Sequence, residues 1–110
     1  MLGKATETVN EPNAKNLDTF ENRDTKLDYL VKFSLEDFTS LCPVTGQPDF
    51  AEIDIMYVPD KTCIETKSLK YYLHSFRNTR SFNESIINQM LQDFVEVTEP
   101  KWMKVIGRFH

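Results

Sequence analysis

The sequence predicts a single α+β domain in which one antiparallel sheet carries two helices on one face. Three observations lead to this prediction. Residues 29–35 and 50–58 alternate apolar and polar side chains with the period of two that is typical of strands. Two later stretches have the period of amphipathic helices, and a last stretch alternates again. With 110 residues the chain can build one two-layer core but not two.

The N-terminal segment is the least apolar part of the chain. Residues 1–27 are rich in Asn, Thr, Glu and Lys. Such a segment buries too little apolar surface to offset the entropy lost on ordering. We therefore expect a mobile polar arm over residues 1–27 and one folded domain over residues 28–110.

Two strands are expected before the helices. Residues 29–35 alternate, and residues 50–58 alternate more clearly. Between them, residues 36–49 contain two prolines, a glycine and several hydroxyl side chains, which predicts a long loop. An ordered long loop in a small domain is a place to look for function. The residues expected on the inner face are Val31, Phe33 and Leu35 in the first strand and Ala51, Ile53, Ile55 and Tyr57 in the second.

Two helices are expected after a turn at residues 59–61 and a short extended piece at residues 62–65. The second helix starts with a capping-box pattern, Ser81 with Glu84, and runs to about Val97. The apolar stripes are Leu69, Tyr72, Leu73 and Phe76 in the first helix, and Ile86, Ile87, Met90, Leu91, Phe94 and Val95 in the second.

The last predicted strand covers residues 101–109, with Met103, Val105 and Phe109 on one face. A further strand that would pair with it is missing from this sequence. Its outer edge would then be exposed, and proteins usually cover or pair such an edge. We expect that a neighbouring subunit pairs with it, or that the chain is a piece of a longer protein.

Composition excludes several classes of function. The net charge is −4 and basic residues form no block, which argues against a general nucleic-acid binder. No apolar run reaches membrane-spanning length, and the N-terminus lacks a signal-peptide core. Two cysteines do not make a disulfide framework, so we expect a cytoplasmic protein with reduced thiols. Cys and His residues lack metal-site spacing, and no Gly-rich phosphate loop is present.

Cys42 is the first candidate for chemistry, because it lies in the predicted loop and outside any apolar period. Packing and function are both open interpretations for it, whereas Cys63 fits a buried strand residue. A reactive thiol needs help to ionise at neutral pH. Asp49, seven residues later, is either a solvated turn residue or a proton donor beside the cysteine.

The start of the first helix is the second candidate. Residues 65–70 place a carboxylate, a serine and two lysines where free N–H groups and the helix dipole favour anions. Solvated lysines at an ordinary helix start are the alternative interpretation. Glu84 is either a capping-box residue or an acceptor for the N–H groups of a guanine-like base, and one carboxylate cannot freely do both.

Two motifs identify a family resemblance. Residues 38–50 (FTSLCPVTGQPDF) and residues 65–72 (ETKSLKYY) resemble the NADPH-dependent 7-cyano-7-deazaguanine reductases of queuosine biosynthesis, in their short single-domain form. The similarity runs from about residue 29 to residue 110 and includes residues 75–78 (SFRN). It implies the tunnelling fold (T-fold), a ββααββ subunit whose sheets join into a barrel. It also implies self-association, as pentameric rings stacked into a decamer with sites between subunits.

The resemblance further implies roles for named residues. Cys42 would add to the nitrile carbon of a deazapurine and form a covalent thioimide, Asp49 would supply protons, and NADPH would deliver two hydrides. Neither a metal, a nucleic acid nor a membrane takes part in this scheme. The residues implied for substrate binding are Ile64, Glu65, Thr66, Asn83 and Glu84, and those for cofactor binding are Lys67 and Lys70.

Two departures from the family keep alternatives open. Asn83 occupies a position where the family usually has histidine, and asparagine cannot titrate. The family also continues past residue 110 with a Pro-Arg-Gly-Gly segment and a last strand. The alternatives are a T-fold relative that forms an amidine on a nitrile carried by tRNA without NADPH, and an inactive binding or assembly subunit.

Overall fold

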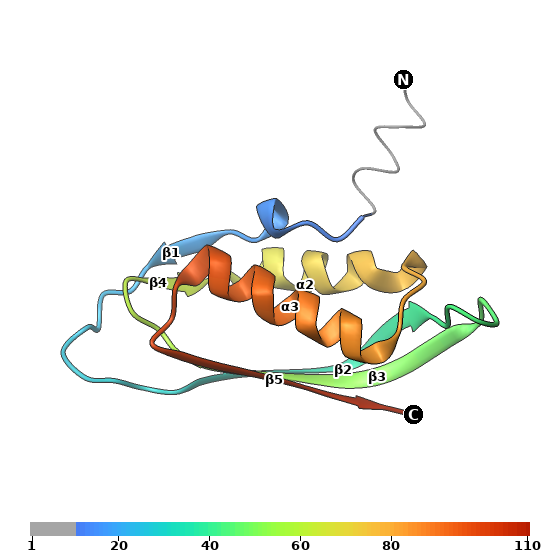
Figure 1. The fold of residues 1–110 in the computed structure, drawn as a ribbon. Helices are drawn as coiled ribbons and strands as arrows, with labels where there is room; N and C mark the ends of the chain where they lie inside the picture. The colour runs from blue at the N-terminus through green and yellow to red at the C-terminus, as the bar shows by residue number, and fades with distance from the viewer. Residues whose placement is uncertain (1–10) are drawn as a thin grey trace, which may run out of the picture.

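The computed structural model describes residues 11–110, and it places two helices against one face of a three-stranded sheet (Figure 1). The strands of this sheet are β2 (Val31–Leu41), β3 (Pro48–Val58) and β5 (Trp102–Phe109), antiparallel in the order β2-β3-β5. The helices are α2 (Thr66–His74), continued by the 3-10 turn η2 (Ser75–Asn78), and α3 (Asn83–Thr98). The predicted α+β class, the antiparallel sheet and the two helices on one face are confirmed.

The core lies between β3 and the two helices. The four inward residues of β3 that the sequence predicted are at most 1% exposed, because β3 is the central strand and its inner face is covered by both helices. The whole predicted stripe of α2 is buried, including Phe76 in η2. In α3 the buried face follows Ile86, Met90 and Phe94, one turn apart. Val95 lies off this line and is exposed, so its predicted burial is wrong.

β2 is longer than the sequence predicted. The expected strand ended at residue 35 and the expected loop covered residues 36–49, whereas β2 reaches Leu41 and only residues 42–47 connect it to β3. A bulge between Leu35 and Phe38 explains the difference, since it interrupts the alternation without ending the strand. Beyond the bulge, Phe38 and Ser40 are buried again. The prediction of a long loop is therefore wrong, and the functional segment is a short hairpin connection.

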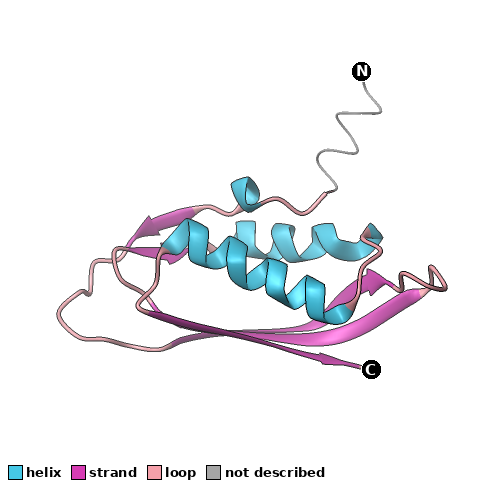
Figure 2. Cartoon of the chain, viewed as in Figure 1, coloured by secondary structure: helices cyan, strands magenta, loops and turns pink. Residues whose placement is uncertain are grey.

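The predicted mobile arm over residues 1–27 is wrong for its second half. Residues 1–10 lie outside the described residues, but η1 (Ala14–Asn16) and β1 (Thr19–Glu21) are formed. β1 pairs antiparallel with β4 (Thr62–Ile64), and this small two-stranded ribbon is separate from the main sheet (Figure 2).

Three contacts order this N-terminal segment. Leu17 is 6% exposed and belongs to the core. The N–H of Asp18 donates to Ser68 Oγ at 2.9 Å. The buried side chain of Asn22 donates through Nδ2 to the carbonyl of Asp60 at 2.8 Å. One apolar anchor and long-range hydrogen bonds thus supply the stabilisation that average composition did not indicate.

The predicted capping box of Ser81 and Glu84 does not form. The N-cap of α3 is Phe82, with no side-chain capping hydrogen bond. The reason is that the preceding segment is held against β2: the N–H of Ser81 donates to the carbonyl of Leu41, and Leu41 forms a parallel bridge with Arg80. Ser81 is therefore part of an extended segment, and the exposed side chain of Glu84 has no capping role.

The third long strand is confirmed, since β5 pairs with β3 from end to end. β2 and β5 are the two edges of this sheet in the described part of the chain. Within residues 11–110, no helix has both the length and the apolar character needed to cross a bilayer.

Candidate active site

Cys42 lies in the tight connection between β2 and β3, one residue after β2 ends. Two backbone hydrogen bonds close this connection: Gly46 N–H donates to the carbonyl of Cys42, and Cys42 N–H donates to the carbonyl of Gln47, both at 2.8 Å. Gly46 has a φ of 73°, a left-handed conformation that glycine adopts without steric cost. The connection therefore presents Cys42 at the end of a rigid hairpin.

The environment of the Cys42 thiol lowers its pKa. The largest cause is a hydrogen bond from the Thr45 side chain, followed by hydrogen bonds from the backbone N–H groups of Thr45 and Val44. Partial burial and the negative charge of Asp49 act in the opposite direction on this pKa. Because the thiolate is the nucleophilic form, these hydrogen bonds within the connection favour the reactive state of Cys42.

Asp49 lies in the same hairpin as Cys42. It is the second residue of β3 and pairs with Ser40 of β2. Its backbone carbonyl accepts a hydrogen bond from Thr39 Oγ1 at 3.0 Å, which fixes the strand at this point. Its negative charge raises the pKa of the Cys42 thiol, so the two side chains interact electrostatically.

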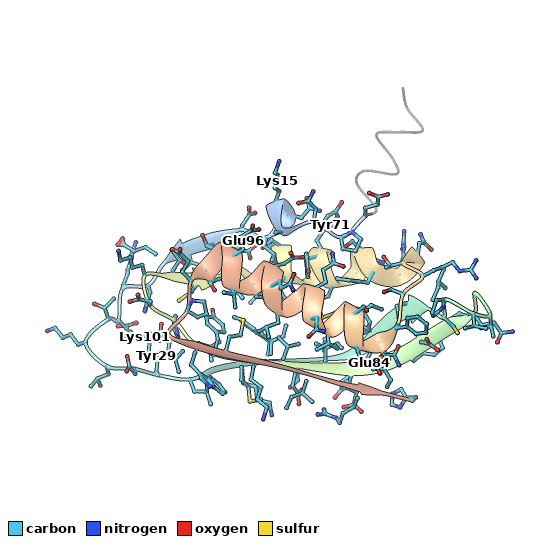
Figure 3. The ribbon with its side chains drawn as sticks, viewed as in Figure 1. Lys15, Tyr29, Tyr71, Glu84, Glu96 and Lys101 are labelled. Atoms are coloured by element: carbon cyan, nitrogen blue, oxygen red, sulfur yellow. The ribbon has the colours of Figure 1, made fainter. Side chains whose placement is uncertain are left out.

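Asn83 and Glu84 line a shallow groove between α3 and β5, together with Ile87, Gly107 and Phe109. Figure 3 shows Glu84 beside β5 at the N-terminal end of α3. This groove is at the same end of the domain as the hairpin, because Phe109 pairs with Ala51, two residues after Asp49. A half-open apolar wall with a carboxylate at its edge can hold one face and one polar edge of a flat heterocycle.

Glu65 is the N-cap of α2. Its Oε2 accepts the N–H of Lys67 at 2.7 Å, and its Oε1 accepts the N–H of Ser68 at 2.9 Å. These two hydrogen bonds, in that order, lower the pKa of the Glu65 carboxyl group. The expectation that these N–H groups are free for an anion is therefore wrong, because a side chain of the same chain already occupies them.

The residues on either side of Glu65 differ in what they can offer a ligand. The Ile64 side chain is buried, and its N–H donates to the hydroxyl of Tyr57 at 2.9 Å. Thr66, the first residue of α2, is exposed.

Lys67 and Lys70 are both exposed but border different hollows. Lys67 lies with η1 residues, including Lys15, which Figure 3 shows above α2. Lys70 lies against β2, with Asp37 and His74. In one chain the two ammonium groups therefore do not converge on a single hollow.

The predicted site residues fall into two groups at opposite ends of α2. Figure 1 shows the β2–β3 hairpin near the C-terminal end of this helix, with the start of α3. Glu65 is at the other end. Nine helical residues span about 13 Å. A single chain thus has Cys42, Asp49, Asn83 and Glu84 at one end of the domain and the residues at the start of α2 at the other.

Sequence reasoning missed three residues near the thiol. Thr45 was part of the quoted motif, and its position in a Cys-Pro-Val-Thr-Gly turn could have indicated a hydroxyl directed back to the sulfur. Arg80 donates to the carbonyl of Pro43 at 3.3 Å across 37 residues of sequence, and no local signal indicates that contact. Ser40, two residues before Cys42, is fully buried in β2. Among residues 11–110, no group of three or more His, Cys, Asp and Glu side chains is arranged to bind a metal ion.

Comparisons with known proteins agree on one family. The family model described as QueF-like protein matches residues 48–110. An NADPH-dependent 7-cyano-7-deazaguanine reductase of Streptococcus thermophilus is 48% identical over 110 residues, covering 99% of this chain and 68% of the relative. A protein of the same name from Bacteroides fragilis is 46% identical over 109 residues, covering 99% and 72%.

A solved structure supports the fold. The chain resembles the crystal structure of the archaeosine synthase QueF-Like in the apo form with a TM-score of 0.70, over 74% of this chain and 81% of that chain. The two sequences are 22% identical, so this likeness concerns the fold alone.

Proposed function

This chain belongs to the QueF-like protein family, and we propose that it catalyses the NADPH-dependent reduction of the nitrile of 7-cyano-7-deazaguanine to an aminomethyl group, a step of queuosine biosynthesis. The observation that carries the proposal is Cys42: a half-buried thiol with a lowered pKa at a rigid hairpin, beside a carboxyl group. A nitrile carbon is a weak electrophile, and such a thiol is suited to capture it. A free thiol also fits the cytoplasm as the proposed location.

The first step is covalent capture by Cys42. Its sulfur bonds to the nitrile carbon, one π bond of the C≡N group breaks, and the nitrogen gains a proton. Asp49 would give that proton and recover one from the thiol, so the step is balanced as thiol plus nitrile to thioimide. Since the thiolate attacks, the hydrogen bonds from Thr45 favour the reactive form.

When bound, NADPH supplies two hydrides in succession, which take the nitrile carbon through the imine to the amine. Cys42 holds the carbon for the first transfer and leaves as a thiolate, and Asp49 donates protons to the nitrogen. Lys67 and Lys70 are exposed ammonium groups that suit the cofactor phosphates. Glu65 occupies the first N–H groups of α2, so these lysines, rather than the helix terminus, would carry that contact.

The base would lie in the groove beside Glu84. A carboxylate accepts the paired N–H donors of a guanine-like edge, and Phe109 and Ile87 offer an apolar wall. Asn83 borders the same groove and can donate or accept a hydrogen bond without titrating. Ile64, Glu65 and Thr66 are proposed as further substrate contacts from the start of α2.

The two separated groups of residues support a site shared between subunits. We propose that the start of α2 from one subunit completes the site around Cys42 of another, in a T-fold assembly of two stacked pentameric rings. The edges of the main sheet, β2 and β5, are where strands of other subunits can pair. Mixing inactive Cys42→Ala and Lys67→Ala proteins tests the sharing. Random reassembly restores about a quarter of wild-type activity if the site is shared, and none if one chain supplies both residues.

The proposed reaction is tested by incubating the protein with 7-cyano-7-deazaguanine and NADPH and following NADPH absorbance and amine formation. The reductase consumes two NADPH for each amine, and Cys42→Ala abolishes this. Capture of the nitrile without NADPH consumption would favour an amidine-forming relative. Neither capture nor consumption would favour a binding or assembly subunit.

A further inference from the structure

We propose that Ser40 is a positioning residue for Asp49, whose carboxyl group it would hold by a hydrogen bond during the reaction. This inference rests on the function proposed above and adds a residue to it. Ser40 lies in β2, two residues before Cys42.

The Ser40 hydroxyl is buried without a partner. Its residue is 0% exposed. Within residues 11–110, Ser40 Oγ is the one fully buried side-chain oxygen or nitrogen atom that has no hydrogen-bond partner. Buried polar groups in proteins are nearly always paired, and exceptions often mark a functional site. Other buried serines follow the rule, since Ser75 Oγ donates to the carbonyl of Tyr72.

The strand register places Asp49 next to this hydroxyl. Ser40 and Asp49 are directly opposite in the β2–β3 ladder, and so are Phe38 and Ala51, two residues further along. Side chains of opposite residues project from the same face, with Cβ atoms about 5 Å apart. Phe38 and Ala51 are buried on the helix face, so Ser40 and Asp49 also project there.

The two side chains are complementary. No donor among residues 11–110 makes a hydrogen bond to the Asp49 carboxylate, since Thr39 Oγ1 donates to the backbone carbonyl of Asp49. The Cys42 sulfur, in contrast, already has donors from Thr45 and Val44. An unpaired hydroxyl donor therefore faces an unpaired carboxylate acceptor. A side-chain rotation on substrate binding is sufficient to join them.

The hydrogen bond would act when Asp49 gives its proton to the substrate nitrogen. The carboxylate then gains negative charge in a partly buried place, and the Ser40 O–H stabilises that charge and fixes the direction of the carboxyl group. No bond to Ser40 forms or breaks.

The test compares Ser40→Ala with Ser75→Ala, each by kcat for NADPH oxidation and by melting temperature. We expect Ser40→Ala to lower kcat roughly ten- to hundredfold, the effect of one hydrogen bond to a charged group, without lowering the melting temperature, because it removes an unpaired hydroxyl. Ser75→Ala should keep its kcat.

A double-mutant cycle gives the decisive readout. In an Asp49→Asn background, Ser40→Ala should have no further effect on kcat, since the two act as one unit. Independent effects of the two substitutions, or a Ser40→Ala protein with full kcat and a lower melting temperature, would overturn this inference alone. A wild-type protein without NADPH oxidation would overturn the proposed function together with it.

Discussion

Replacing Tyr57 by phenylalanine tests how the sheet positions the start of α2. The Tyr57 ring is 1% exposed, and its hydroxyl accepts the N–H of Ile64 at 2.9 Å. The substitution leaves the ring in place and leaves this N–H unpaired at a residue that is 2% exposed. An unsatisfied buried group costs about 1–3 kcal/mol. For a domain near this size, each kcal/mol lowers the melting temperature by roughly 4–8 °C.

Tyr29→Phe is the matched control. The Tyr29 hydroxyl donates to Asn22 Oδ1 at 2.7 Å, but that oxygen also accepts the N–H of Asp24 at 3.1 Å and stays satisfied. We expect a loss of about 0.5–1 kcal/mol, measured by urea denaturation at one protein concentration. A Tyr57→Phe protein that loses no more stability than the control would show that the Tyr57 hydroxyl does not stabilise the backbone at Ile64.

Three further predictions concern the hairpin that carries the thiol. Asp49→Asn removes the charge that opposes ionisation, so the pKa of the Cys42 thiol falls and its alkylation by iodoacetamide at neutral pH becomes faster, while turnover drops about 10²–10⁴-fold. Slower alkylation or near-normal turnover would contradict this. Thr45→Val removes the main hydrogen bond to the thiolate, so the pKa of Cys42 rises and the alkylation rate, followed against pH, shifts to higher pH. An unchanged curve would exclude Thr45 as the activating group. Gly46→Ala forces a left-handed conformation on a residue with a Cβ and places that atom 3.3 Å from Arg80 Nη2, for a cost of about 1–2 kcal/mol in urea denaturation. Wild-type stability would show that the connection relaxes without strain.

The sequence was sufficient where one periodicity covered a whole element. β3 and α2 were predicted because their apolar residues keep one period, and each is buried as expected. The strand predicted for residues 29–35 ends too early, because the alternation of apolar residues is shifted at the bulge after Leu35. Composition predicts an arm around Leu17, because a single anchoring residue hardly changes the average composition of a segment. Alternation reports on neighbouring residues, and composition reports an average over a segment. Neither signal contains the contacts between distant segments that extend β2 and hold the chain around Leu17.

The candidate site also contains residues that the sequence predicted and residues that it did not. Cys42 and Asp49 were found from a motif, and the hairpin brings them together since they are close in sequence. The capping role was assigned to the wrong residues: Glu65 is a cap and Glu84 is not. A capping-box pattern does not show that Arg80 and Ser81 are held in an extended conformation by Leu41 of β2. The unpaired Ser40 hydroxyl could not be predicted at all, because its burial depends on the strand register and on the packing of the helices.

The most direct test of the covalent mechanism is the mass of the protein after incubation with 7-cyano-7-deazaguanine without NADPH, followed by tryptic mapping. Trypsin separates the two cysteines, because Lys61 lies between Cys42 and Cys63. We expect an intact mass increased by one molecule of nitrile, located on the Cys42 peptide and lost in Cys42→Ala. Adduct that persists in Cys42→Ala, or that maps to Cys63, would contradict it.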